Sequence, residues 1–477
     1  MARLAVLAAM LCGCAQLFGL DETSGGPPSA SLSFERVSIG ARVVTAPQDL
    51  SGSMATYLVP DDADPTGLAR VAAIEVEPGR WTAPITRPAP VLFDLPDYPE
   101  PVLRIFDFPQ VEVKGLFGVL EHPSPQPAPE GATITVNTTL DVPFNGTDRF
   151  ELFTLGSWNA VALAAPAVGA TVLTQTFPFT AMSSLTGRMP HERITADDAA
   201  VVLRYAGNEL RGAVRAAPFD QTGADTVSGP LTTVELQPFS FAIDQVDLMR
   251  RYGLARPLAG TPSMQWTLRA APGAQLNTDL GPLLAAGGPT DATTVSSQAG
   301  NPFAPDWPST VLWLTRASRT YTPPAAGLPV TLFAGMHERA ILESGLQMKL
   351  PAGLPTRITL IGTVLENDGV TIAKPARGVE VSFQTDVPEN TMYQLQLFKL
   401  VPNAAMTALQ YELKLGANGV QPRFVLPPEL FEAGALYTLR AITVAGGFPG
   451  IAEGDLTQRS IPIAVSFLDS GVFQVAP

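Results

Sequence analysis

The sequence predicts an all-β protein made of several β-sandwich domains in tandem. Short runs in which apolar and polar residues alternate recur along the chain, as in residues 379–383, and a period of two is typical of strands with one buried face. The 477 residues include 46 prolines and 41 glycines, which indicates many turns between these runs. No stretch with the 3.6-residue period of an amphipathic helix is long enough to build a βαβ unit.

The first residues have the pattern of a secretory signal. Arg3 supplies a positive charge, and residues 4–11 form an apolar run rich in leucine and alanine. This run is much shorter than the ~20 residues that a transmembrane helix needs, so it fits the apolar core of a signal peptide. Two cysteines follow, in the sequence Leu11-Cys12-Gly13-Cys14.

This tetrad resembles the lipobox of bacterial lipoproteins, in which a leucine stands three residues before the modified cysteine and a small residue stands directly before it. Cys14 fits because Gly13 precedes it, whereas Cys12 follows the bulky Leu11. The other interpretation is an ordinary cleaved signal peptide with two incidental cysteines.

The resemblance implies that residues 1–13 are removed and that Cys14 carries the lipid. Several acyl chains on one residue would hold the protein at a membrane stably. Ala15 stands where lipoproteins of the inner membrane carry aspartate, so we expect anchoring at the bacterial outer membrane, on its surface or its periplasmic face. Residues 14–30 are rich in turn formers and are expected to be a flexible tether.

The composition limits the partners. The net charge of −14 argues against nucleic acid, because phosphate binding needs clustered lysine and arginine. It also disfavours adsorption to anionic lipid head groups, so the attached lipid has to supply the membrane contact. Both cysteines of the chain lie in the signal region, so a lipidated Cys14 leaves no thiol for a disulfide or a thiolate metal site.

Turn-rich breaks divide the remaining chain. We expect a small β domain at 31–97, a β-sandwich at 98–238, a β-rich domain with long loops at 239–350 and a last sandwich at 351–477. The break near residue 97 follows from the proline-dense stretch 94–101, which is unsuited to a central strand. In the third of these regions, the spacing of Val246, Met249 and Arg250 indicates a short helix within 239–253.

The last domain carries the clearest pattern. Its segment from Leu426-Pro427 to Tyr437 resembles the corner between strands E and F of fibronectin type III domains. In that family a leucine and a proline precede a tyrosine whose hydroxyl reaches back to the backbone upstream. The resemblance implies a fibronectin III- or Ig-like sandwich for this domain. One departure is Phe383, where the family usually has tryptophan.

No catalytic grouping is evident. The three histidines are His122, His191 and His337. His191 and His337 each begin a His-Glu-Arg sequence, but neither sequence continues to the second histidine of a zinc-protease helix. We therefore interpret them as polar loop residues and expect no metal. A Gly-x-Ser-x-Gly elbow, a Walker loop and a dinucleotide-binding glycine turn are all missing, so no catalytic residue and no cofactor is predicted.

Two polar motifs stay open to a second interpretation. Asp61, Asp62 and Asp64 form an acidic turn that could hold Ca²⁺, but they lack the spacing of a calcium loop and are expected to be solvated. Asn145-Gly146-Thr147 matches a glycosylation acceptor and is expected to be a hairpin turn instead.

These features favour a non-catalytic, membrane-anchored lipoprotein that binds a protein or glycan ligand at the cell envelope or takes part in assembly there. One alternative is an enzyme that processes polysaccharides or peptides, which would place a carboxylate pair in a cleft walled by aromatics such as Trp158, Trp307 or Trp313. Another is a structural envelope spacer, with neither a cleft nor a large apolar patch.

Overall fold

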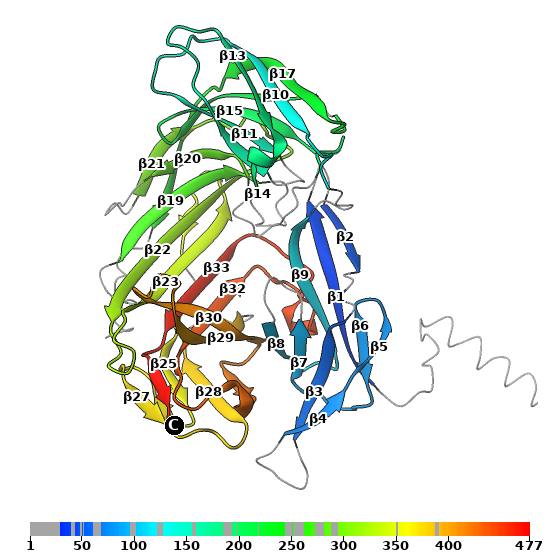
Figure 1. The fold of residues 1–477 in the computed structure, drawn as a ribbon, viewed down its shortest axis with the longest axis vertical. Coiled ribbons are helices and arrows are strands. Elements are labelled where there is room, and N and C mark those ends of the chain that lie inside the picture. Colours follow the sequence, from blue (N-terminus) through cyan, green and yellow to red (C-terminus); the bar gives the residue numbers. More distant parts are fainter. Residues whose placement is uncertain are drawn as a thin grey trace, which may run out of the picture.

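The computed structural model describes residues 29–39, 43–47, 50, 52–60, 68–95, 102–121, 127–154, 159–184, 193–196, 198–217, 219–243, 250, 262–271, 281–287, 294–349, 352–386 and 391–477. Nearly all regular structure in these ranges is β-strand, arranged as four sandwiches (Figure 1). The predicted all-β, tandem-sandwich fold is confirmed. Within the described ranges no helix has the length and apolar content needed to cross a membrane. The lipobox with Cys14 lies outside them.

The first sandwich packs two sheets around a cluster of aromatic rings. One sheet has the order β9–β1–β6–β5, with β2 beside the second half of β1 and β9 parallel to β1. The other has the order β4–β3–β7–β8. The ring of Phe93 lies 4.7 Å from that of Phe34 and 4.9 Å from that of Trp81, centroid to centroid. The strands are β1 (Ala30–Ile39), β2 (Val43–Pro47), β3 (Met54–Pro60), β4 (Leu68–Ala72), β5 (Ile74–Glu77), β6 (Arg80–Ala83), β7 (Val91–Leu95), β8 (Val102–Asp107) and β9 (Glu112–Glu121).

Strand pairing carries this sandwich past the boundary expected at residue 97. β8 pairs with β7, and β9 pairs with β1, so the domain continues to Glu121. Prolines end a strand, but they carry no information on whether the next strand returns to the same sheet.

The second sandwich has one sheet of order β13–β10–β17 and another of order β14–β12–β11–β15–β16. Alternate residues of β10 are buried, among them Ile134 and Val136. The strands are β10 (Thr133–Leu140), β11 (Arg149–Thr154), β12 (Asn159–Leu163), β13 (Val172–Pro178), β14 (Ser183–Ser184), β15 (Ala200–Ala206), β16 (Glu209–Arg215) and β17 (Ala224–Thr233).

A buried ion pair holds the loop between β10 and β11. Arg204 Nε donates to Asp148 Oδ2 at 2.6 Å, and both side chains are almost fully buried. The same guanidinium donates to the carbonyl oxygens of Val142 and Pro143. Asn145 Oδ1 accepts the backbone N–H groups of Thr147 and Asp148, so the Asn-Gly-Thr sequence forms a turn, as expected.

In the third sandwich a sheet of order β21–β18–β24 faces the strands β20–β19–β22–β23. The expected helix at 239–253 is wrong at its start, because β18 occupies 237–243. Residues 244–249 and 251–253 lie outside the described part. Phe239, Phe241 and Ile243 share one face of β18, and this period of two is the reason for the strand. The strands are β18 (Gln237–Ile243), β19 (Ser263–Ala270), β20 (Leu283–Gly287), β21 (Thr294–Ala299), β22 (Ser309–Tyr321), β23 (Val330–Ile341) and β24 (Gln347–Met348).

The fourth sandwich packs the sheet β26–β25–β28–β31 on the strands β30–β29–β32–β33, and β32 also pairs with β34, which runs parallel to β27. This arrangement is a β-sandwich. Tyr437 accepts the N–H of Glu432 at 2.8 Å and donates to the carbonyl of Leu430 at 3.0 Å, so its hydroxyl does reach the backbone upstream. Phe383 is buried. The strands are β25 (Thr356–Leu360), β26 (Thr363–Val364), β27 (Val370–Ile372), β28 (Val379–Gln384), β29 (Thr391–Pro402), β30 (Leu409–Gly419), β31 (Arg423–Leu426), β32 (Leu436–Gly446), β33 (Ile463–Asp469) and β34 (Phe473–Val475).

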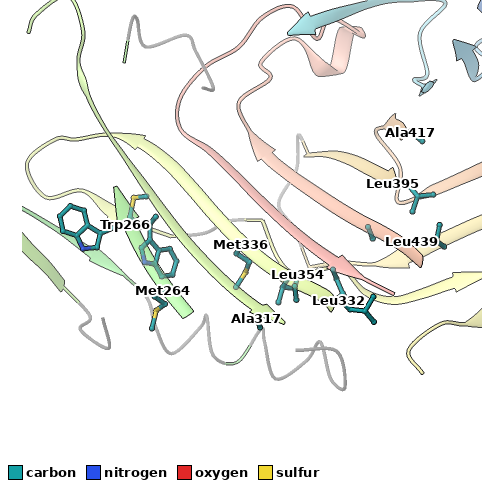
Figure 2. Close-up of a cluster of buried hydrophobic side chains, with 14 of the residues drawn as sticks. Met264, Trp266, Ala317, Leu332, Met336, Leu354, Leu395, Ala417 and Leu439 are labelled. Atoms are coloured by element: carbon teal, nitrogen blue, oxygen red, sulfur yellow. The ribbon is translucent and has the colours of Figure 1, made fainter. Parts of the chain in front are cut away.

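Strand pairing also joins the domains to one another, and their order in space differs from their order in the chain. β8 of the first domain pairs in parallel with β30 of the fourth, and β33 of the fourth pairs with β23 of the third. A single residue pair, Glu209 with Ala285, joins β16 of the second domain to β20 of the third. The fourth domain therefore lies between the first and the third (Figure 1). One apolar core runs through this junction, from Trp266 and Met336 to Leu354, Leu395 and Leu439 (Figure 2).

A buried carboxylate ties the third and fourth domains together. Asp469 of β33 is fully buried and accepts four hydrogen bonds, two from Arg440, one from the hydroxyl of Tyr411 and one from the N–H of Phe333 in β23. Arg440 also lies over the ring of Phe467, 5.0 Å from its centroid. Burial and the nearby carboxylate raise the pKa of Tyr411, so its hydroxyl stays protonated even in alkaline solution.

Candidate functional site

The candidate site is a groove in the third domain with a volume of about 500 Å³. It lies between β18, its neighbour β21 and the turn that leads from β23 to β24. A volume of this size falls within the range of ligand-binding pockets. The lining residues are Pro238, Phe239, Ser240, Ser296, Ser297, Leu342, Glu343, Ser344 and Gly345.

The edge of β18 beside this turn is only partly paired. β24 is two residues long and pairs with Ala242 and Ile243 alone. Ala242 donates its N–H to Leu346 across this edge, and backbone groups alternate in direction along a strand. The carbonyl of Pro238 and both backbone groups of Ser240 therefore face the same edge, where no backbone strand pairs with them in the described ranges. Pro238 costs the ladder between β18 and β21 no hydrogen bond, because an N–H at this position would have pointed away from β21, to the same edge.

An aromatic ring fixed from behind forms part of the wall. Phe239 stacks on Phe241, with parallel rings 6.5 Å apart, and meets the edge of Trp266 at 5.7 Å. Trp266 can lie there because residue 287 is glycine: a Cβ at Gly287 would come within 2.1 Å of the indole nitrogen. Phe239 itself is only half-buried, so its ring is held by the core and remains accessible from the groove.

The remaining wall is polar and carries one charge. Among the lining residues Glu343 is the single ionisable side chain, and in the part of the chain described it has no salt-bridge partner. Four serines supply hydroxyl groups that can donate and accept. Gly345 allows the tight turn that holds Glu343 opposite β18, since its φ of 78° is unfavourable for other residues.

The earlier candidate residues that the structure describes, Trp307, Trp313 and His337, do not line this groove. Trp307 and Trp313 are buried, as expected for core residues. His337 is not a loop histidine: it lies in the middle of β23, and burial lowers its pKa. The charged residues Glu338 and Arg339 beside it suggested an exposed loop, but both are buried in the strand. His122, His191, Trp158 and the acidic turn at Asp61, Asp62 and Asp64 lie outside the described residues.

No three histidine, cysteine or carboxylate side chains among the described residues converge on a point where a metal ion could bind. The residues of the groove were missed in the sequence for a simple reason. The stretch that begins at Phe239 was assigned to a helix, and serines at 296, 297 and 344 look like ordinary loop residues. The alternation from Phe239 to Ile243 was the signal that could have revealed the strand.

No protein-family model and no curated protein matches the sequence. Among solved structures, a Streptococcal ancillary pilin aligns over 67% of this chain and 98% of its own, at 9% identity and a TM-score of 0.13. A leucine-rich repeat protein from Bacteroides thetaiotaomicron aligns over 46% of this chain and 25% of its own, at 8% identity and a TM-score of 0.11. Likenesses this weak carry no argument about function.

Proposed function

We propose that the protein is a non-catalytic, lipid-anchored binding module of the bacterial outer membrane that captures an extended peptide segment by strand addition to β18. The observation that carries this proposal is the groove beside β18, where a strand edge that has no strand partner among the described residues meets a cavity. In strand addition, main-chain hydrogen bonds supply affinity, and a pocket for alternate side chains supplies specificity. Here the edge of β18 would supply the main-chain hydrogen bonds, and the wall formed by Phe239 and Glu343 would supply the side-chain pocket.

The alternatives fit the groove less well. A glycosidase needs two carboxylates flanking the scissile bond, and the groove offers Glu343 alone. A structural spacer has no use for a cavity with an aromatic wall. Peptide binding at the cell envelope accounts for both the groove and the lipid anchor expected at Cys14.

We expect Ser240→Pro to weaken peptide binding by about tenfold or more, since it removes the N–H that residue 240 directs to this edge and places a ring in the path of the added strand. The fold should tolerate it, because the N–H of residue 240 takes no part in the ladder between β18 and β21, and Pro238 already occupies an equivalent position. Binding of a labelled seven-residue threonine–valine peptide can be followed by fluorescence anisotropy.

Gln298→Pro is the matched control. Gln298 lies opposite Pro238 on β21, its N–H points away from β18, and its side chain does not line the groove. It should bind the peptide like the parent protein. Equal binding by both proline variants, with both folded by circular dichroism, would show that the peptide does not add to β18.

The anchor has its own test. Cys14→Ala should move the protein from the membrane fraction to the soluble fraction, because the acyl chains that hold it would be missing. A variant that fractionates with the membrane as the native protein does would contradict the lipid anchor. Protease treatment of intact cells then separates the two faces: cleavage of the native protein indicates the cell surface, and protection indicates the periplasm.

A further inference from the structure

The groove has a one-sided electrostatic character. Its lining combines the carboxylate of Glu343 with serine hydroxyls and contains no lysine, arginine or histidine. The chain as a whole carries a net charge of −14, so the surrounding field has the same sign. A ligand group that enters this groove with a negative charge is repelled, and one with a positive charge is attracted.

We propose that the groove selects an extended peptide that carries a lysine or arginine side chain, with Glu343 as the residue that recognises the cation. This inference rests on the proposed strand addition at β18. It adds the chemical class of the peptide and the residue that determines its specificity.

The walls of the groove match the two parts of such a side chain. Lysine and arginine have an apolar stem and a charged head. Phe239 presents an aromatic surface that suits the stem, and an aromatic face also attracts a cation. The turn that contains Glu343 and Ser344 lies across from β18, where a carboxylate and a hydroxyl can accept hydrogen bonds from the head. Every second side chain of an added strand points to the same side. The lysine or arginine therefore has to stand at one of the alternate positions whose side chains point into the groove.

The test compares three peptides that differ at one position. The central residue of the threonine–valine peptide is lysine, its uncharged analogue norleucine, or glutamate. We expect the lysine peptide to bind about fivefold more tightly than the norleucine peptide and the glutamate peptide to bind more weakly than both, which is the size of effect typical of a partly exposed ion pair. Rising salt concentration should reduce the preference for lysine.

Glu343→Gln should remove this preference while it leaves binding of the norleucine peptide unchanged. Glu343 is exposed, so the substitution should not disturb folding. Glu130→Gln, at an exposed glutamate of the second domain, is the control and should keep the preference.

The outcomes separate the two proposals. If all three peptides bind equally and Ser240→Pro still abolishes binding, strand addition stands and the selection by Glu343 is wrong. If no peptide binds to the parent protein at millimolar concentration, strand addition itself is wrong and the inference fails with it. Binding of neutral oligosaccharides, lost in Phe239→Ala, in the absence of peptide binding would assign the groove to glycans and overturn both.

Discussion

Replacing Asp469 by alanine should lower the free energy of unfolding by about 3–5 kcal/mol, the largest effect we expect from one polar substitution. The carboxylate is fully buried and accepts four hydrogen bonds. Its removal takes away the carboxylate that accepts two hydrogen bonds from the mostly buried guanidinium of Arg440. The hydroxyl of Tyr411 keeps one acceptor, the carbonyl oxygen of Thr331 at 2.8 Å. The N–H of Phe333 loses its partner as well, so the loss falls on the junction between the third and fourth domains.

Urea unfolding followed by tryptophan fluorescence measures this difference, and Asp469→Asn should lie between the parent and the alanine variant because an amide oxygen can still accept. Glu380→Ala is the control, since Glu380 pairs with Arg423 on the surface at 2.5 Å and exposed pairs contribute at most about 1 kcal/mol. A change below about 1 kcal/mol in Asp469→Ala would mean that this network does not hold the domains together.

The second large effect is expected for Asp148→Ala, again about 3–5 kcal/mol, but confined to the second domain. Without the carboxylate, Arg204 keeps a buried positive charge, and the turn built on Asn145 loses the hydrogen bond from the Asn145 amide to Asp148. Arg204 lies over the ring of Phe150, which belongs to the apolar cluster inside the second sandwich. Hydrogen exchange should therefore accelerate most in β10 to β17 and least in the fourth domain.

A double variant sharpens this test. Asp148→Ala with Arg204→Met removes both charges, so it should be more stable than Asp148→Ala alone, although it loses one more native side chain. Arg211→Ala, at an exposed arginine on the same sheet, should change the stability by less than about 1 kcal/mol. If the double variant is the less stable one, the uncompensated charge of Arg204 is not the cause of the loss.

The sequence predicted the class of the fold because alternation and turn residues act locally. The corner at Tyr437 was also within reach, since its leucine, proline and tyrosine lie close together in the chain. The error at 239–253 came from weighing Val246 and Met249 above the alternation of Phe239, Phe241 and Ile243. Both patterns meet at the end of β18, and the ends of an element are where a periodicity predicts it least well.

The groove and the contacts between domains could not be predicted in this way. β8 and β30 have no local feature that marks them as partners, because parallel pairing over a long separation depends on how whole domains pack. The same holds for Asp469, whose hydrogen-bond donors Arg440, Tyr411 and Phe333 lie on three other strands. Glu343 and Ser240 lie far apart in the sequence, and only the tertiary fold brings them to one cavity.

The pairing of β8 with β30 has a consequence for the order in which the chain can be completed. Synthesis runs from the amino terminus, and domains fold as they emerge. The edge of β8 in the first domain then stays unpaired until β30 has been synthesised, and the edge of β23 stays unpaired until β33 has been synthesised. Open edges invite pairing with other chains. A chain that ends before its last domain therefore exposes the edges of β8 and β23 and should be prone to aggregate.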